Sequence, residues 1–249
     1  MSHTELQDPV TRVNQYRKAL HFYLSETTLP IVFCENTMYD ISTEFRIHID
    51  SGRLEYMTFD GNRYDRKKGK GYGEALIMKY AIEKSKLIKE SKYIIKITGR
   101  IIITNINHFS SSFYYTFNNL FRSNINENFI PTYLFIARPF LIAKFVERYR
   151  EKIKEVPPTK ESVEHQWFRA LTKDTLFNNT TFIPFILIPN VVGISGTTGK
   201  SYSMKDRLIW NLACSFRFEM ARNNKVLALT HLAAYYILYI FNKIRDKLS

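Results

Sequence analysis

The chain has 249 residues, of which 45% are hydrophobic and 15% are aromatic. This composition supplies enough apolar surface for a packed core and excludes an intrinsically disordered chain. The formal net charge of +13 predicts an anionic partner, which is nucleic acid, a phosphorylated small molecule or an acidic membrane surface.

Helices and strands are predicted to alternate along the first half of the chain. Asp8 followed by Pro9 is typical of a helix start, because Asp caps free N–H groups and Pro suits the first helical position. Residues 30–34 and 54–59 are expected to be short apolar strands, the second ending at a turn signal, Asp60-Gly61. A basic, glycine-rich loop over residues 63–73 then precedes a predicted amphipathic helix over residues 74–90.

The same alternation continues in the second half. We expect a strand region at 93–103, a loop near the site at 110–123, a strand at 182–188 and a helix at 203–221. The apolar run 133–145 suits either the core or a surface that faces an acceptor. No linker divides the chain, since Pro157-Pro158 is interpreted as a loop inside one domain. The pattern predicts an α/β fold with a largely parallel or mixed sheet.

The turn Lys96-Ile-Thr-Gly-Arg100 interrupts an apolar, β-branched strand region. Burying a Lys and an Arg costs several kcal/mol unless each meets an anion or a carboxylate. Two cations at the end of a central strand therefore indicate a site for negative charge, such as a diphosphate. The alternative is a strand end whose charges are solvated, because charged residues are mostly found on the surface.

Two other motifs also follow predicted strands or open a helix, where ligands bind in open α/β sheets. Glu35-Asn36 follows the first strand and is expected near a nucleotide. The segment Lys68-Gly-Lys-Gly-Tyr-Gly-Glu74 opens a helix, and glycines there let backbone N–H groups approach phosphate oxygens. The residues expected to contact the diphosphate are Lys68, Lys70, Gly71 and Gly73. The alternative is a solvated turn, since the segment matches neither the P-loop nor the dinucleotide fingerprint.

These motifs resemble those of bacterial polysaccharide glycosyltransferases of the GT-A type, as found in capsule and O-antigen assembly. The resemblance covers most of residues 8–205, including an opening helix with Arg12, Tyr16 and Leu20. It rests further on the motifs Glu35-Asn36, Lys68–Glu74, Lys96–Arg100, Val163-Glu164-His165 and Gly193-Ile-Ser-Gly-Thr-Thr-Gly199. It implies one GT-A-like domain with a Rossmann-like mixed central sheet flanked by helices, a nucleotide-sugar donor and a glycan or lipid-linked acceptor. Thr98 and Gly99 would then belong to the donor site.

The chain departs from this family's pattern at the metal site. GT-A enzymes usually carry an Asp-x-Asp pair at the end of a central strand, and no such pair occurs in this chain. A cationic side chain and a metal both stabilise charge on a leaving diphosphate. We therefore expect Arg100, together with Lys96 or a lysine of residues 68–70, to replace the metal. Asp60 or Asp65 could still hold Mn²⁺ or Mg²⁺, so metal dependence stays open.

Glu164 is the candidate for acceptor chemistry. The resemblance places an acidic helix start at this point, and an inverting enzyme needs a carboxylate to take the proton of the acceptor hydroxyl. His165 is the second candidate, because the reference pKa of histidine suits proton transfer. The alternative is a solvated helix carboxylate beside a packed histidine.

The segment 193–201 is expected to be a loop over the donor, with Ser195 and Gly196 in contact with it. It is not a Walker A motif, because position 194, where the first glycine of that motif belongs, is Ile. A plain surface loop is the alternative.

The apolar C-terminal stretch 226–241 is short for a membrane span, which needs about 20 apolar residues. Basic residues flank it, namely Arg222, Lys225, Lys243, Arg245 and Lys247. This pattern favours a helix on an anionic membrane surface, with a helix packed on the domain or a dimer contact as the alternatives. We expect a catalytic domain over residues 1–222 and this helix over 223–249.

The sequence thus predicts a cytoplasmic enzyme that is peripheral on the inner face of the cell membrane. Cys34 and Cys214 lack metal-binding spacing, which fits a reducing cytoplasm, and the N-terminus lacks the basic and apolar regions of a signal peptide. The alternative class is a non-catalytic basic module that binds nucleic acid or an anionic membrane. A nucleic-acid partner is not expected, because the cations gather at strand ends and at a glycine loop.

Overall fold

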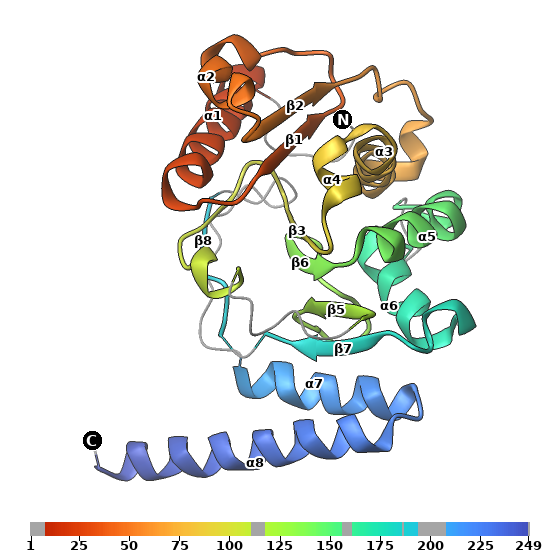
Figure 1. Cartoon of the computed structure of the whole chain (residues 1–249). Helices are drawn as coiled ribbons and strands as arrows, with labels where there is room; N and C mark the ends of the chain where they lie inside the picture. The colour runs from red at the N-terminus through yellow and green to blue at the C-terminus, as the bar shows by residue number, and fades with distance from the viewer. Residues whose placement is uncertain (1–7, 111–117, 156–160, 186, 194–207, 249) are drawn as a thin grey trace.

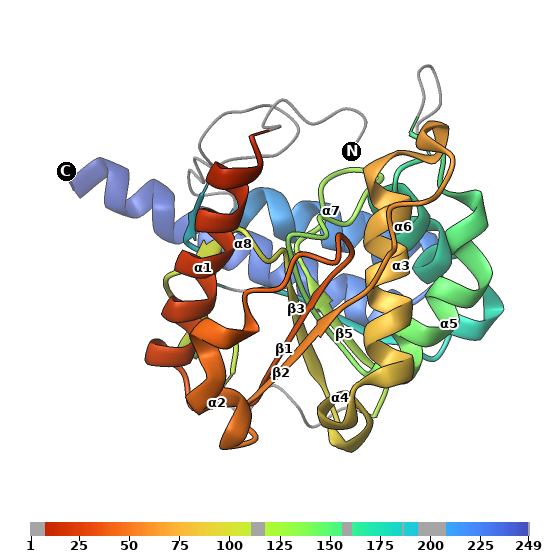
Figure 2. The same ribbon diagram turned by 90° about the horizontal axis from the view of Figure 1, so that it is seen from above.

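The computed structural model describes residues 8–110, 118–155, 161–185, 187–193 and 208–248. Within these residues the fold is mixed α/β, as the sequence predicts. A parallel pair of strands, a four-stranded mixed sheet and a short antiparallel pair form its β-structure. Helices lie on both sides of the strands (Figures 1 and 2).

The N-terminal unit follows the sequence prediction closely. Helix α1 (Pro9–Glu26) begins at Asp8, whose carboxylate accepts hydrogen bonds from the N–H groups of Val10 and Thr11. Strands β1 (Ile31–Glu35) and β2 (Leu54–Thr58) pair in parallel, and the short α2 (Arg46–Asp50) lies between them in the chain. Leu20 and Leu24 of α1 pack with Phe45 and Leu54, so burial of the apolar face of α1 holds this unit together.

The glycine-rich segment is part of a helix rather than a loop, which corrects the sequence prediction. Helix α3 (Gly69–Lys84) begins at the first of its glycines and follows a short 3₁₀ turn over Arg66–Lys68. The predicted single helix over 74–90 is also divided. Ser85 is extended and caps a separate α4 (Lys86–Glu90) by accepting from the N–H of Ile88. The carboxylate of Glu55 on β2 accepts from Ser85, Lys86 and Leu87, which fixes this break.

The central sheet has the strand order β3-β6-β5-β7. Strand β6 runs antiparallel to both of its neighbours, whereas β5 and β7 are parallel. Its strands are β3 (Ile94–Ile97), β6 (Leu134–Ala137), β5 (Leu120–Ser123) and β7 (Thr181–Pro184). The prediction of a loop over 110–123 was wrong for residues 120–123, which form a fully buried strand, and residues 111–117 lie outside the described chain.

The turn at residues 98–101 separates two strands that belong to different sheets. Strand β4 (Ile102–Ile103) pairs with β8 (Val191–Val192) and not with the sheet that contains β3. The cationic turn therefore lies where the chain leaves the central sheet, which agrees with a break between two apolar stretches.

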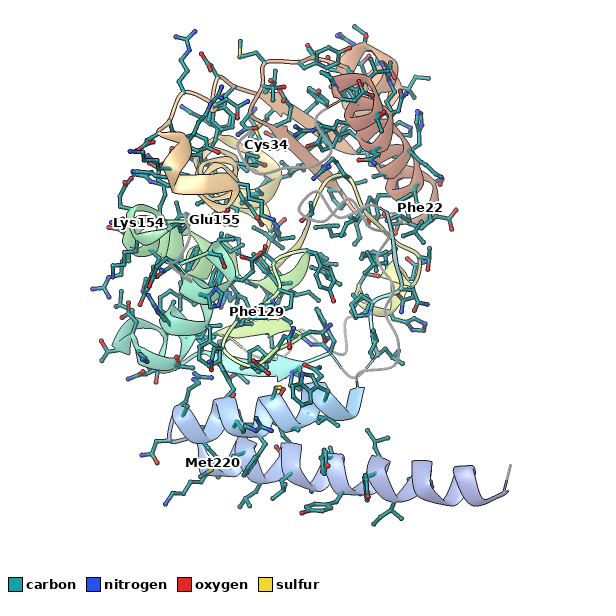
Figure 3. All side chains as sticks on the ribbon, turned by 180° about the vertical axis from the view of Figure 1, so that it is seen from behind. Phe22, Cys34, Phe129, Lys154, Glu155 and Met220 are labelled. Atoms are coloured by element: carbon teal, nitrogen blue, oxygen red, sulfur yellow. The ribbon has the colours of Figure 1, made fainter. Side chains whose placement is uncertain are left out.

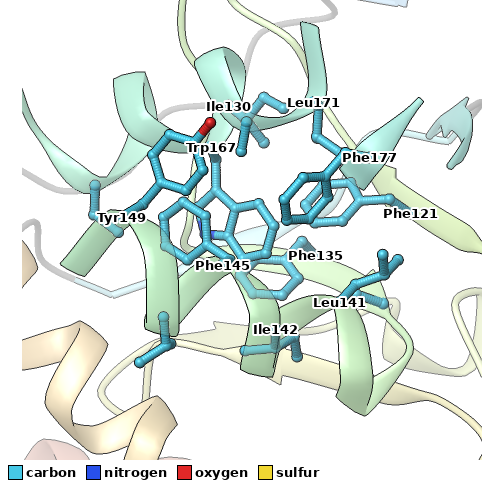
Figure 4. Packing of buried hydrophobic residues seen from close by; sticks show 14 of the residues in the cluster. Phe121, Ile130, Phe135, Leu141, Ile142, Phe145, Tyr149, Trp167, Leu171 and Phe177 are labelled. Carbon is cyan, nitrogen blue, oxygen red and sulfur yellow. The ribbon is translucent and has the colours of Figure 1, made fainter. Parts of the chain in front are cut away.

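An aromatic core fills the space between the central sheet and helices α5 (Pro139–Tyr149) and α6 (Val163–Lys173). Trp167 is fully buried and stacks on Phe145 with a centroid separation of 3.7 Å (Figure 4). Phe121 and Phe135 of the sheet pack on the same indole. The apolar run 133–145 therefore belongs to the core, where burial of large rings stabilises the fold.

Helices α7 (Leu208–Ala221) and α8 (Lys225–Leu248) form a hairpin that packs against β7 through α7 (Figure 1). The part of the predicted helix at 203–207 lies outside the described residues. Ala228 and His231 of α8 are buried against the protein. The opposite face of α8 is apolar and exposed, with the members Val226, Leu229, Tyr236, Ile237, Ile240 and Phe241. No helix in the described part of the chain has the length and apolar character to cross a membrane.

Candidate functional site

A cavity of about 1180 Å³ lies where the ends of β1 and β3 meet the first turns of α3. Three of the sequence motifs contribute to its wall. These residues are Glu35, Asn36, Lys70, Gly73, Glu74, Lys96, Thr98, Gly99 and Arg100. Glu164 at the start of α6 lines the same cavity. The fold therefore gathers residues from 35 to 164 around one space.

Part of the cavity wall is aromatic. Phe33 of β1 stacks on Tyr56 of β2 at a centroid separation of 5.1 Å, and Tyr16 of α1 meets Phe33 edge-on at 5.7 Å. Gly99 lies against these rings, because a Cβ at this position would come within 3.2 Å of the Tyr16 ring. The glycine thus lets the cationic turn approach the aromatic wall closely.

Glu35 and Asn36 differ in what their side chains contact. The Glu35 carboxylate accepts hydrogen bonds from the backbone N–H of Thr37 and from the hydroxyls of Thr37 and Thr58. It therefore holds the chain after β1 in place. Asn36 is 4% exposed and lines the cavity. Its amide can both donate and accept hydrogen bonds, so Asn36 is the better candidate to meet a ligand.

The two cations of the turn also have different partners. The Lys96 ammonium forms an ion pair with Glu74 and donates to the carbonyl oxygen of Thr132. By contrast, the Arg100 Nη1 atom is buried and has no hydrogen-bond partner in the part of the chain that the structure describes. A buried charged donor that lacks an acceptor favours an anion in the cavity beside it.

The glycines of α3 accommodate protein side chains. The backbone N–H groups of Lys70 and Gly71 donate to the carboxylate of Glu155 over 2.9 Å and 3.1 Å. Glu155 is labelled in Figure 3. A Cβ at Gly69 or Gly71 would collide with the Glu155 side chain, and one at Gly73 would come within 2.6 Å of the Tyr64 hydroxyl. The glycine spacing is therefore explained by close packing, and a phosphate at these two N–H groups would have to displace Glu155.

The remaining lysines of the segment divide between the surface and the cavity. Lys68 forms an ion pair with Glu151 and does not belong to the described cavity wall, and neither does Gly71. Lys70 and Gly73 do line the cavity. Of the four residues predicted to bind a diphosphate from this segment, these two are placed to reach a ligand there.

Glu155 has a pKa raised to about 7. The first cause is burial, which disfavours the charged form, and the second is the negative charge of Glu164. The positive charge of Lys70 and the two backbone N–H groups lower the pKa of Glu155 and so partly offset these two causes. Glu155 therefore carries a proton for part of the time near neutral pH, close to the candidate base.

Glu164 is held at the N-terminal end of α6 with its carboxylate toward the cavity. Its Oε1 atom lies 3.3 Å from the hydroxyl of Thr132, which is 4% exposed. His165 points elsewhere, because its Nδ1 atom lies 2.8 Å from the Ser162 hydroxyl and its ring packs on Phe129. His165 is not part of the described cavity wall, so the geometry favours Glu164 over His165 as the base.

The aspartates considered for a metal have partners of their own. Asp60 forms an ion pair with Arg63, and Asp65 accepts from the N–H of Lys67 at the turn before α3. The described residues contain no group of three or more His, Cys, Asp or Glu side chains that could hold a metal ion. These aspartates do not fit a metal site in this arrangement, and the metal-free interpretation stays a prediction.

Sequence reasoning missed Thr132, which lines the cavity, and Glu155, which accepts from the start of α3, and it gave Glu74 no role. Thr132 follows Pro131 in an ordinary loop, and Glu155 lies in a basic stretch, so neither shows a sequence signal. Ser195 and Gly196 lie outside the described residues. Comparisons of the chain with protein-family models, with curated proteins and with solved structures each found no match.

Proposed function

We propose that this protein is a nucleotide-sugar-dependent glycosyltransferase of the GT-A type, which acts in the assembly of a bacterial surface polysaccharide. The supporting observation is a cavity that contains an aromatic wall, the Arg100 guanidinium, whose Nη1 atom has no hydrogen-bond partner in the described residues, and the Glu164 carboxylate. The aromatic wall would bind the nucleobase, Arg100 would bind the diphosphate, and Glu164 would take the proton of the acceptor hydroxyl. The resemblance of the sequence motifs supports the same assignment.

In this proposal the donor lies along the cavity. The nucleobase packs on the aromatic wall, and the Asn36 amide hydrogen-bonds to its edge. The diphosphate contacts Arg100, with Lys70 and Lys96 nearby. Because charge builds on the diphosphate as the sugar leaves, fixed cations at this point stabilise the transition state more than the ground state.

Glu164 acts on the acceptor, which is a glycan or a lipid-linked saccharide. Its carboxylate takes the hydroxyl proton while the acceptor oxygen bonds to the anomeric carbon and the bond to the diphosphate oxygen breaks. This role requires inversion at the anomeric carbon. The position of Glu164 in the cavity wall supports its assignment as the base.

Donor binding is the direct test. A nucleotide sugar at 100 times its Kd should stabilise the protein by about 2.7 kcal/mol, which thermal unfolding with UDP-, GDP-, CMP- and dTDP-linked sugars can detect. Isothermal titration calorimetry with the same compounds gives the Kd. The substitution Asn36→Ala should weaken binding and so raise the Kd. Stabilisation by DNA or RNA and by none of the nucleotide sugars would contradict the proposal and favour a nucleic-acid module.

We propose further that the enzyme acts in the cytoplasm, at the inner face of the cell membrane. The exposed face of α8 has apolar side chains at helical spacing, and residues 226–241 include no Lys, Arg, Asp or Glu. Basic residues precede and follow this stretch in the sequence. An apolar face flanked by cations fits the interface of an anionic bilayer.

Vesicle sedimentation tests this second part. Ile237 and Ile240 are each 55% exposed, so Ile237→Glu with Ile240→Glu should reduce pelleting with anionic vesicles without disturbing the core. Ile47→Glu on α2 is the matched control, since Ile47 is 83% exposed and far along the chain from α8. Equal pelleting of both variants and the parent would contradict membrane binding through α8.

A further inference from the structure

The hydroxyl of Thr132 lies between two carboxylates at the cavity. Its Oγ1 atom is 3.3 Å from Glu74 Oε2 and 3.3 Å from Glu164 Oε1. The backbone carbonyl of the same residue accepts from Lys96, which forms the ion pair with Glu74. Thr132 is 4% exposed, so bulk water does not compete strongly for this hydroxyl. One residue therefore connects the candidate base to the partly buried ion pair.

A hydroxyl has one hydrogen to donate and lone pairs that accept. Thr132 can therefore donate to Glu164 while that side chain is a carboxylate. When Glu164 has taken a proton, its own O–H can donate to Thr132 Oγ1, and the threonine hydrogen turns toward Glu74. Both states of Glu164 keep a hydrogen-bond partner, and no group has to move beyond a rotation of the hydroxyl.

We propose that Thr132 is a positioning residue that holds Glu164 for proton abstraction and that its hydroxyl changes from donor to acceptor as Glu164 takes the proton. This inference rests on the proposed glycosyl transfer. The other charged groups around the pair are Glu74 and Lys96, which contact Thr132, and Glu155 and Lys70, of which Glu155 interacts electrostatically with Glu164 and accepts from the backbone N–H of Lys70. They remain unchanged in the experiment below.

Thr132→Val tests the hydroxyl, because valine keeps the shape of threonine and cannot donate or accept. We expect kcat to fall about tenfold or more, as for loss of a hydrogen bond to a charged group. The acidic limb of the kcat/KM profile should move to higher pH, because the carboxylate form of Glu164 loses its donor. The Kd for the nucleotide sugar should stay within about twofold of the parent, since the partners of this hydroxyl are Glu74 and Glu164. Thr132→Ser should restore both kcat and the profile.

A merely structural role gives a different pattern. If Thr132→Val has the parent's kcat and pH profile, or if Thr132→Ser is impaired as strongly as Thr132→Val, the proposal is overturned. Circular dichroism and urea unfolding of each variant show whether the fold survives. Where valine prevents folding, Thr132→Ser and Thr132→Ala provide the same comparison.

A second measurement separates this inference from the proposed function. Carboxyl-labelled glutamate in NMR reports the titration midpoint of Glu164 without any substrate. The midpoint should move to higher pH in Thr132→Val and remain in place in Thr132→Ser. If the parent binds no nucleotide sugar but the midpoint moves, the proposed function fails and the positioning contact stands. If donor binding is intact and the midpoint does not move, the positioning role fails alone.

Discussion

Glu155 and Glu219 both have a pKa raised to about 7, and in both cases burial is the first cause. Their surroundings differ. Glu155 accepts from two backbone N–H groups at the start of α3 and is repelled by Glu164, whose side chain lines the cavity. Glu219 is fully buried in α7, and its nearest charge is Arg222 three residues later.

The partners of Arg222 explain the second environment. Its Nη2 atom donates to the carbonyl oxygens of Phe177, Asn178 and Thr180, so the pair ties α7 to the segment before β7. Nothing at this pair opens to the cavity. The comparison teaches that a raised pKa does not identify a functional site by itself, because burial of a structural carboxyl inside a helix hairpin produces the same shift. The neighbouring groups decide which kind of site it is.

Glu219→Ala should have the largest effect, and it should act on stability. Removing the carboxylate leaves Arg222 buried without its partner, which costs about 3–5 kcal/mol of the free energy of unfolding. Urea unfolding at pH 7.5 measures this loss. Glu147→Ala on α5 is the control, since Glu147 is exposed and its loss should cost less than about 0.5 kcal/mol. A small effect of Glu219→Ala would show that the ion pair with Arg222 contributes little to stability and does not distinguish Glu219 from Glu155.

Glu164→Gln should leave stability unchanged and lower turnover about a hundredfold or more. Glutamine keeps the size of the side chain but cannot accept a proton at neutral pH. The measurement is kcat with a nucleotide sugar and an acceptor, with donor binding followed separately. Full turnover in a folded Glu164→Gln variant would count against both the base assignment and inversion.

Arg100→Ala should lower turnover about a hundredfold, as for loss of one donor to a developing anion. The fold should survive, because Nη1 of Arg100 makes no hydrogen bond within the described residues. Lys68→Ala is a matched control, since Lys68 pairs with Glu151 outside the cavity wall. Equal activity of the two variants would remove Arg100 from the mechanism.

Glu155→Gln should have the smallest effect, and pH should reveal it. The pKa of Glu155 rises from 4.5 to about 7 on folding, so the folded protein binds this proton more tightly than the unfolded chain. The stabilising contribution is complete below about pH 4.5 and is lost as the pH rises through about 7. The stability of Glu155→Gln relative to the parent should therefore increase between pH 5 and pH 8.

The difference between variant and parent is the right measure, because other groups titrate in the same window. Glu219 acts in the same direction as Glu155, whereas His231, whose pKa is lowered to about 4 by burial, acts in the opposite direction. These contributions cancel in the difference. Urea unfolding at intervals of one pH unit gives the result, and a difference that does not change with pH would show that Glu155 stays ionised in the folded protein.

Local patterns predicted the elements whose signals lie within a few residues. The cap at Asp8 and the strands β1 and β2 were predicted in this way, whereas the helix that carries Glu164 was expected from the resemblance. The start of α3 was not predicted, because glycine is a poor helix former and the sequence shows no reason for three glycines within the first five residues of a helix. The reason lies in Glu155 and Tyr64, whose side chains occupy the space that Cβ atoms would need.

The sequence by itself determined that the chain is basic, mixed α/β in its elements, and marked by cations near strand ends. Only the tertiary structure decided which of these cations are already neutralised. Lys96 meets Glu74 and Lys68 meets Glu151, across 22 and 83 positions of the chain, whereas Nη1 of Arg100 meets no acceptor in the described residues. Such pairings depend on how segments far apart in the chain pack together, and this packing has no local signature in the sequence.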